Sequence, residues 1–406
     1  MAAKAVPAAT HDPVPLDFGD FVDSDHEIDI EAESEDTLQY FLGYFYPVCI
    51  GDLFNQRYQV IHKLGRGGFS TVWLAHDLKT LKDVALKVLS SSGDAKEYET
   101  HQYIAQRVQD CSRLVLCQDQ LVLSRMDNGV KYQHTVLVLP LRGPSLFTFH
   151  IKTKRPLTCS MSAAKQLLQA VSSLHDAGLV HRVDIVLPNI LCGLNVDLAK
   201  MSTAEKYKVL GRPRKARALK EGDQVVGELV APAKFPLDIL SSDTYLCDFG
   251  ILVEAGTSVP NELQSPAGYC APELFHDFEP SFAGDMWSYM VVFLYLYTEY
   301  PASPAWGFAG NVDSIVERVG VLPLEWKGRY INKGTVQESW YEDASQSKDI
   351  FSALLDQHRP DISAKEKGLA LSVIRQVFRM KPKDRVRASD LLGNGDFEAL
   401  MSIYGV

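Results

Sequence analysis

The stretch HRVDIVLPNIL (His181–Leu191) carries an aspartate and an asparagine five residues apart, Asp184 and Asn189. A carboxylate can orient a hydroxyl nucleophile and take up its proton, and a carboxamide oxygen can hold a divalent cation. Further along, YLCDFG contains a second carboxylate, Asp248, which is placed to carry a cation that bridges phosphate groups. These residue types in this order suit the transfer of a phosphoryl group.

A glycine-rich turn stands upstream in LGRGGFSTV, from Leu64 to Val72. Gly65 and Gly67 permit a close approach of the backbone to a ligand. A strand, this turn, a second strand and a lysine on a third strand together lay backbone amides over a polyphosphate and aim an ammonium at it. That lysine is Lys87 in VALK. Glycines also mark ordinary hairpin turns, so the motif gains its weight from the residues that follow it.

The segment after this lysine, Ala95–Gln109, predicts a helix that offers Glu97 and Glu99 as ion-pair partners for Lys87. We prefer Glu97, because Ile104 lies two turns further on the same face and would turn that face inward. Either glutamate could instead be a surface charge.

Two further motifs follow in order. APE (Ala271–Glu273) places a glutamate that needs an arginine partner, and KPKDRVRASDLL supplies Arg385. Asp285 in GDMWS is expected to accept hydrogen bonds from backbone amides of the Asp184 loop. The six features occur in an order that chance does not explain.

The elements that must position these residues change along the chain. Strand patterns occur at Asp83–Leu89 and His134–Leu141, and helical periodicity dominates from Ser160 onward. We therefore expect an α+β fold with a small antiparallel sheet, one helix beside it, and a mainly helical second part. An irregular insert is expected at 193–243, where the proline and glycine in the basic run Lys206–Lys220 argue against a continuous helix.

Charge is distributed unevenly over the 406 residues, whose net charge is −10. Residues 1–56 carry a net charge of −11, which leaves +1 for the rest. The composition of Asp17–Asp36 predicts a solvated, disordered segment, so residues 1–39 are assigned to an acidic disordered tail. An alternative hypothesis is that this acidic segment folds back on the basic insert. The basic insert could instead be a nuclear-import segment or a loose surface segment.

Composition argues against several other classes of protein. The seven cysteines are scattered and show no CxxC spacing, so neither a disulfide framework nor a zinc site is indicated. No run of about 18 apolar residues is present, and the N-terminus lacks a signal-peptide pattern. We expect a soluble protein of the cytoplasm, the nucleus or both.

From about Tyr40 to Val406, the order of these motifs resembles the eukaryotic protein-kinase family. YPVCIGDLFNQRYQVIHKLGRGGFSTVWLAHD closely resembles the entry to the serine/arginine-rich protein-specific kinase (SRPK) group, including Ser70 where most kinases have a third glycine. The long insert is typical of that group, and LGRPRKARAL resembles inserts of its fungal members. The resemblance implies a bilobal kinase fold, with an N-lobe at 40–141 and a C-lobe at 142–406.

The resemblance also implies a serine/threonine protein kinase that uses ATP and Mg²⁺. Asp184, Lys87 and Glu97 would be catalytic, and Asn189 and Asp248 would hold the metal. The adenine would lie between the lobes, pairing with the carbonyl of Pro140 and the N–H of Arg142, after a gatekeeper at Leu139. The implied nucleotide-binding residues are Leu64, Gly65, Arg66, Gly67, Gly68, Phe69, Ser70, Thr71, Val72, Ala85, Lys87, Pro140, Arg142 and Leu191. The expected partner is a protein substrate, with no nucleic acid or membrane, and the expected state is a monomer.

The catalytic loop departs from the family pattern in two ways. His181 stands one residue too early, so either Arg182 takes the histidine position or a one-residue bulge precedes Asp184. Val186 replaces a lysine that contacts the transferring phosphoryl group, a loss worth roughly 3 to 4 kcal/mol in the transition state. A pseudokinase that binds nucleotide or partners without efficient turnover is therefore the alternative function.

Substrate preference is a separate question. SRPKs recognise Arg/Ser-rich chains through acidic grooves in the helical lobe. The corresponding segment here, 311–330, mixes acidic and basic residues: Asp313, Glu317, Glu325, Arg318, Lys327 and Arg329. A protein substrate is expected, and Arg/Ser-rich sequence is one candidate for it.

Overall fold

The computed structural model describes residues 17–93, 96–127, 129–148, 156–221, 224–259, 265–299, 311–331, 336–342 and 350–406. The chain forms two compact units. We call them the sheet unit, made of the described parts of 1–93, 118–141 and 196–238, and the helical unit, made of the described parts of 94–117, 142–195 and 239–406.

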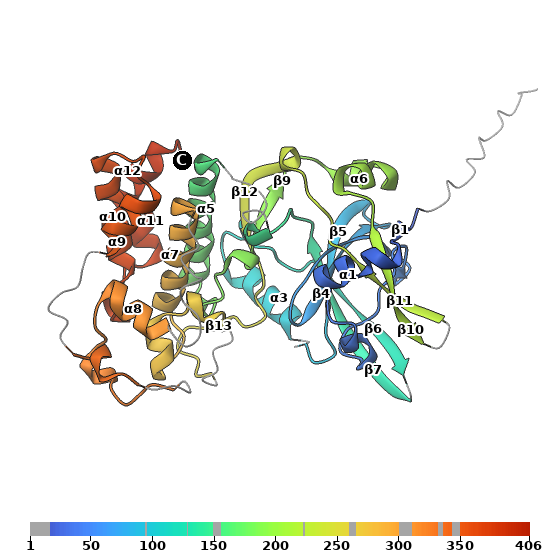
Figure 1. Cartoon of the computed structure of the whole chain (residues 1–406), viewed down its shortest axis with the longest axis horizontal. Helices are drawn as coiled ribbons and strands as arrows, with labels where there is room; N and C mark the ends of the chain where they lie inside the picture. Colours follow the sequence, from blue (N-terminus) through green and yellow to red (C-terminus); the bar gives the residue numbers. More distant parts are fainter. Residues whose placement is uncertain are drawn as a thin grey trace, which may run out of the picture. The chain divides into compact units, whose positions relative to one another are not determined.

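A six-stranded sheet with only antiparallel neighbours forms the centre of the sheet unit, in the order β2-β3-β4-β5-β7-β6 (Figure 1). Trp73, Leu86 and Val136 are fully buried in its core, because β-branched and aromatic side chains alternate along these strands. The expected antiparallel sheet is confirmed. The strands are β2 (Leu53–Phe54), β3 (Tyr58–Arg66), β4 (Ser70–Asp77), β5 (Lys82–Leu89), β6 (Asp119–Asp127) and β7 (Val130–Pro140).

The acidic segment and the insert form a second layer of structure in the sheet unit. Strand β1 pairs in parallel with β10, and β10 pairs with β11. The additional helices and strands are β1 (Asp20–Phe21), α1 (Ser24–Glu33), α2 (Leu38–Phe41), α6 (Thr203–Leu210), β10 (Arg214–Glu221) and β11 (Gln224–Val230). The prediction of disorder over 17–36 is therefore wrong, as is the irregular assignment for these parts of the insert. Residues 1–16 of the predicted tail lie outside the described residues.

Specific contacts explain this correction. Ile30 is fully buried in a small apolar cluster with Tyr40 and Leu229, and composition averaged over the segment does not predict such an anchor. Arg212 forms ion pairs with Asp17 and Asp20. The hypothesis that the acidic segment folds back on the basic insert is thus confirmed.

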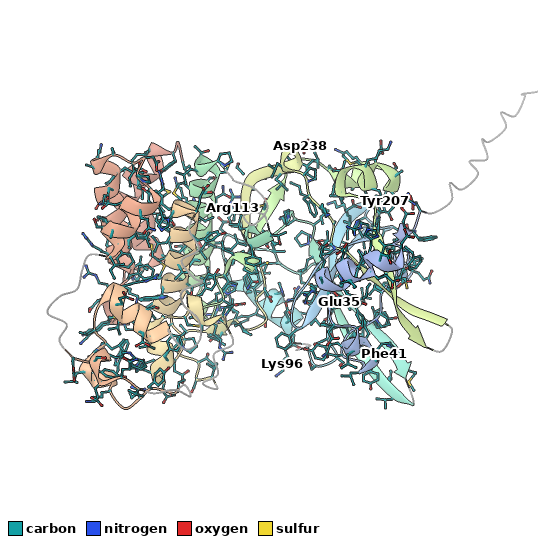
Figure 2. All side chains as sticks on the ribbon, in the orientation of Figure 1. Glu35, Phe41, Lys96, Arg113, Tyr207 and Asp238 are labelled. Atoms are coloured by element: carbon teal, nitrogen blue, oxygen red, sulfur yellow. The ribbon has the colours of Figure 1, made fainter. Side chains whose placement is uncertain are left out.

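Helix α6 shows how the insert is held against the sheet. Ser202 and Glu205 form a capping box at its start, and Gly211, with φ of +82°, ends it. The hydroxyl of Tyr207 lies within hydrogen-bond distance of the carbonyl oxygens of Asp17 and Ile61, at 2.9 and 3.1 Å (Figure 2). The insert thereby connects the acidic segment to strand β3.

The helical unit is organised around α5 and α7, which pack against each other (Figure 1). Its helices are α3 (Glu97–Arg107), α5 (Leu157–Asp176), α7 (Phe282–Thr298), α8 (Asn311–Val319), α9 (Ile350–His358), α10 (Ala364–Val377), α11 (Ala388–Leu392) and α12 (Gly395–Ile403). Two short antiparallel pairs accompany them: β8 (Leu179–Val180) with β13 (Val253–Glu254), and β9 (Ile190–Leu194) with β12 (Leu240–Leu246). No helix in the described part of the chain is long and apolar enough to cross a bilayer.

Single turns of 3-10 helix occur at η1 (Leu187–Asn189), η2 (Leu198–Lys200), η3 (Leu237–Ile239), η4 (Ala267–Tyr269), η5 (Pro272–His276), η6 (Leu324–Trp326), η7 (Glu338–Trp340) and η8 (Pro382–Asp384). The unit boundary at residues 141 and 142 coincides with the expected lobe boundary. Two segments belong to another unit than the expected lobes would place them in. The described part of 94–117, with α3, belongs to the helical unit, and that of 196–238 belongs to the sheet unit.

Candidate active site

The β9–β12 pair brings the Asp184 loop and the DFG segment together within the helical unit. The Cys247 N–H donates to the carbonyl oxygen of Asn189 at 2.9 Å, which places Asp248 next to that loop. The Nδ2 of Asn189 donates to Asp184 at both the carboxylate Oδ2 (2.7 Å) and the carbonyl oxygen (3.1 Å). The structure thus groups three residues that the sequence places up to 64 positions apart.

The backbone before Asp184 contains one extra residue. Asp285 at the start of α7 accepts hydrogen bonds from the N–H groups of His181 (2.7 Å) and Val183 (2.8 Å), as expected for this aspartate. Arg182, between them, and Val183 have φ angles of +68° and +64°. Such left-handed backbone costs energy in residues other than glycine and occurs where the surroundings fix it. Of the two alternatives left by the sequence, the structure shows the one-residue bulge.

His181 serves as a packing group in this arrangement. Its side chain is 1% exposed, and its ring lies 5.4 Å from the Phe249 ring. Burial lowers the pKa of His181, and the carboxylates of Asp285 and Asp248 offset only part of that effect. A neutral imidazole that lies edge-on to the Phe249 ring of the DFG segment follows from these surroundings.

Helix α3 presents one of its two candidate glutamates to the interior. Glu97 is buried together with Ile104, whereas Glu99 is exposed, which is the orientation that the apolar spacing predicted. A Cβ built on Gly250 would lie 3.4 Å from the Glu97 Oε2, so this carboxylate is adjacent to the DFG segment. His101, one turn after Glu97, packs against the other side of the same segment at 5.5 Å from the Phe249 ring. His101 is not among the residues expected at the site, although its i,i+4 spacing from Glu97 places it on the same face of the helix.

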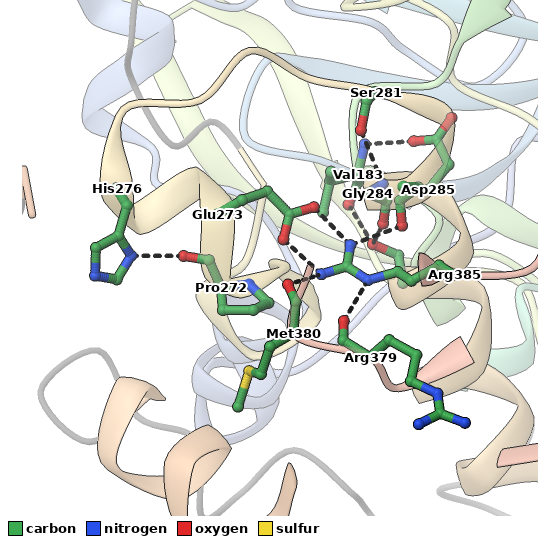
Figure 3. A network of polar contacts seen from close by, with 12 residues as sticks. Val183, Pro272, Glu273, His276, Ser281, Gly284, Asp285, Arg379, Met380 and Arg385 are labelled. Atoms are coloured by element: carbon green, nitrogen blue, oxygen red, sulfur yellow. Dashed lines mark hydrogen bonds and ion pairs between the residues drawn. The ribbon is translucent and has the colours of Figure 1, made fainter. Parts of the chain in front are cut away.

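A buried ion pair between Glu273 and Arg385 supports the Asp184 loop (Figure 3). Glu273 and Arg385 form two parallel contacts of 2.6 Å, and both side chains are almost fully buried. Arg385 also donates to the carbonyl oxygens of Ala283, Arg379 and Met380. The predicted pairing of Glu273 with Arg385 is confirmed, and it ties the APE segment to the start of α7.

The glycine turn connects β3 and β4 in the sheet unit. Gly67 N–H donates to the Ser70 carbonyl at 2.8 Å, and the tip residue Phe69 is 70% exposed. A Cβ built on Gly65 or Gly68 would meet no atom within 4 Å, so packing within the protein does not require glycine at either position. This open backbone fits the close approach of a ligand.

Strand register fixes the residues behind the turn. Val72 lies opposite Lys87, and Ala85 lies opposite Leu139. The other predicted nucleotide residues divide between the two units, with Pro140 in the sheet unit and Arg142 and Leu191 in the helical unit.

The donor set fits a hard divalent cation. Because the Asn189 amide nitrogen is bonded to Asp184, its amide oxygen is the atom that remains for a cation, and Asp248 adds a carboxylate nearby. Mg²⁺ typically uses one or two protein oxygens and completes its shell with water and phosphate. Within the described ranges, no group of three or more His, Cys, Asp or Glu side chains could hold a metal ion.

Val186 is the departure with a direct chemical consequence. Its side chain is 3% exposed, so it faces the protein interior and brings no charge to the loop. Burial raises the pKa of the Cys270 thiol, the carboxylates of Asp184 and Glu273 add to this effect, and together they bring the pKa to about 12. Cys270 is therefore a neutral thiol beside the loop and not a nucleophile.

Comparisons with known proteins agree with this geometry. Residues 58–206 match the protein kinase domain family. A solved crystal structure of a kinase domain superposes with a TM-score of 0.58 at 18% identity and covers 87% of this chain and 99% of that one. This structural similarity shows that the chain has the fold of a protein kinase domain.

Several curated protein kinases are similar in sequence to this chain. SRSF protein kinase 3 of Sus scrofa is 34% identical over 200 residues, which is 46% of this chain and 35% of that protein. The human protein of the same name is 32% identical over 219 residues, or 51% of this chain and 37% of the relative. Protein kinase dsk1 of Schizosaccharomyces pombe is 30% identical over 178 residues, or 41% of this chain and 32% of the relative. The chain is thus similar to protein kinases over part of its length, and the aligned part spans about a third of the length of these curated relatives.

Proposed function

We propose that this chain transfers the γ-phosphoryl group of ATP to serine or threonine hydroxyls of proteins. The observation that carries the proposal is the joint placement of Asp184, Asn189 and Asp248 by the β9–β12 pair and by Asp285. Backbone strain like that at Arg182 and Val183 concentrates at functional sites, which agrees with this proposal.

Each residue has a defined part in this reaction. Asp184 would accept the hydroxyl proton, with its carboxylate oriented by the amide of Asn189. Lys87 would bind phosphate oxygens below the open glycine turn, with Glu97 as its partner. Asn189 and Asp248 would hold Mg²⁺, which neutralises phosphate charge when bound. The substitution at Val186 leaves these groups in place and removes one cation from the transition state.

The substrate is expected to be a protein segment, and the charges of 311–331 bear on its type. Asp313 accepts a hydrogen bond from the Trp340 indole, and Glu325 pairs with Lys381. These carboxylates are already used within the protein, so an Arg/Ser-rich segment gains little from them.

Phosphate transfer from labelled Mg-ATP tests the proposal. An Arg/Ser-repeat peptide and a generic basic protein serve as substrates, and Asp184→Asn serves as the matched inactive variant. Transfer that disappears in the variant supports a kinase, and the preferred substrate decides the specificity. Binding of Mg-ATP without any transfer would contradict the proposal and support a pseudokinase.

A gain-of-function variant gives a second test. Val186→Lys should raise transfer by on the order of a hundredfold if the missing cation limits turnover. An unchanged rate would show that another group already supplies this charge.

A further inference from the structure

The surroundings of His101 determine which ring nitrogen carries the hydrogen. The backbone N–H of Cys117 points at the His101 Nδ1 at 3.1 Å. An amide N–H can only donate, so Nδ1 must present its lone pair. The hydrogen of the neutral ring therefore lies on Nε2.

This hydrogen faces the carboxylate of Glu97. The Nε2 of His101 lies 3.6 Å from the Glu97 Oε1, and His101 and Glu97 are 2% and 6% exposed. The distance is slightly longer than a hydrogen bond, and among the described residues Nε2 has no hydrogen-bond partner. A small rotation of the Glu97 side chain would complete the bond and satisfy a buried donor.

We propose that His101 is a positioning residue that holds the Glu97 carboxylate through Nε2–H while Cys117 fixes its tautomer. A neutral donor orients the carboxylate without cancelling its negative charge. The inference rests on the proposed function for the role of Lys87 and Glu97. Its structural part, the donor on His101, does not depend on that function.

The chain could instead need His101 only for packing, because its ring lies edge-on to Phe249 at an interplanar angle of 81°. Two amide substitutions separate these roles. In His101→Gln the side-chain NH₂ reaches the position of Nε2 and can donate to Glu97. In His101→Asn the side-chain oxygen replaces Nδ1 and keeps the Cys117 contact, but the donor to Glu97 is lost.

Kinetics and binding are measured on the full-length chain, with the exposed His26→Asn as the matched control. We expect His101→Asn to lose roughly tenfold or more in kcat/KM and in Mg-ATP affinity, and His101→Gln to stay within about threefold. The two variants should differ little in unfolding free energy. If activity and affinity follow the unfolding free energy in both variants, His101 is only a packing residue and the proposal is overturned.

Nitrogen NMR of histidine-labelled protein tests the tautomer directly. The His101 resonances, assigned by their loss in His101→Gln, should show an Nε2–H and a lone-pair Nδ1, and the opposite tautomer would refute the proposal. If the wild-type chain transfers no phosphate, the proposed function fails by itself. The Mg-ATP affinities of the Asn and Gln variants then decide this inference, where a weaker Asn variant upholds it and equal affinities overturn it.

Discussion

The contact between Glu35 and Lys63 offers a sharp test of how the acidic segment is attached (Figure 2 labels Glu35). The Nζ of Lys63 pairs with the Glu35 Oε2, and the Tyr40 hydroxyl donates to the Glu35 Oε1. The side chains of Lys63 and Glu35 are 0% and 1% exposed. Burial lowers the pKa of Lys63, and the Glu35 charge offsets part of this effect.

Replacement of Glu35 by glutamine would leave the Lys63 ammonium buried without a counter-charge. Removal of one partner of a buried pair typically costs about 3 to 5 kcal/mol. Glu35 lies within residues 24–41, and Lys63 lies on β3, two residues before Gly65. We therefore expect the loss of this ion pair to weaken the attachment of residues 24–41 to the sheet. Glu31→Gln is the matched control, since it removes the same charge at an exposed position of α1 and should change stability by less than about 0.5 kcal/mol.

Urea unfolding measures the free energy, and hydrogen exchange of peptides from 24–41 measures local opening. The triple variant Glu35→Leu/Tyr40→Phe/Lys63→Met removes all three polar groups together and should recover most of the loss. If Glu35→Gln behaves like Glu31→Gln in both measurements, the argument for a buried pair is refuted.

Three further predictions concern the helical unit. The pKa of His181 in the folded protein lies below its unfolded value, so the unfolded chain binds the proton first and stability should fall as the pH drops below about 6.5. The urea midpoints at pH 7.5 and 5.5 should therefore differ less in His181→Phe than in the wild type. An equal pH response in both proteins would contradict the lowered pKa of His181. Arg385→Lys cannot reproduce the bidentate contact with Glu273 and should lose about 3 kcal/mol or more in an unfolding titration, so a change below about 1 kcal/mol would refute the role of this pair. Cys270, with its pKa of about 12, should resist alkylation by iodoacetamide at pH 8 in the folded protein, whereas the half-buried Cys159 should be modified. Mass spectrometry follows the labelling of both thiols, and early labelling of Cys270 would contradict its burial.

The order of chemical motifs could be predicted from the sequence alone. Short-range patterns carry that information: the five-residue spacing of Asp184 and Asn189, the glycine turn before Lys87, and the apolar face that pairs Glu97 with Ile104. The proline and glycine of the insert likewise argued against a continuous helix there, and α6 does end at Gly211. Such features depend on neighbours along the chain, so no tertiary contact is needed to recognise them.

Tertiary contacts decided the rest. The bulge at Arg182 follows from Asp285, more than 100 residues away, which accepts hydrogen bonds from both flanking amides. The ordered acidic segment follows from Ile30, whose partner Leu229 lies in the insert, and from Glu35, whose partner Lys63 lies in β3. Net charge per segment averages over these residues, whereas the free energy of burial depends on which single side chain meets a partner, and only the folded chain determines that.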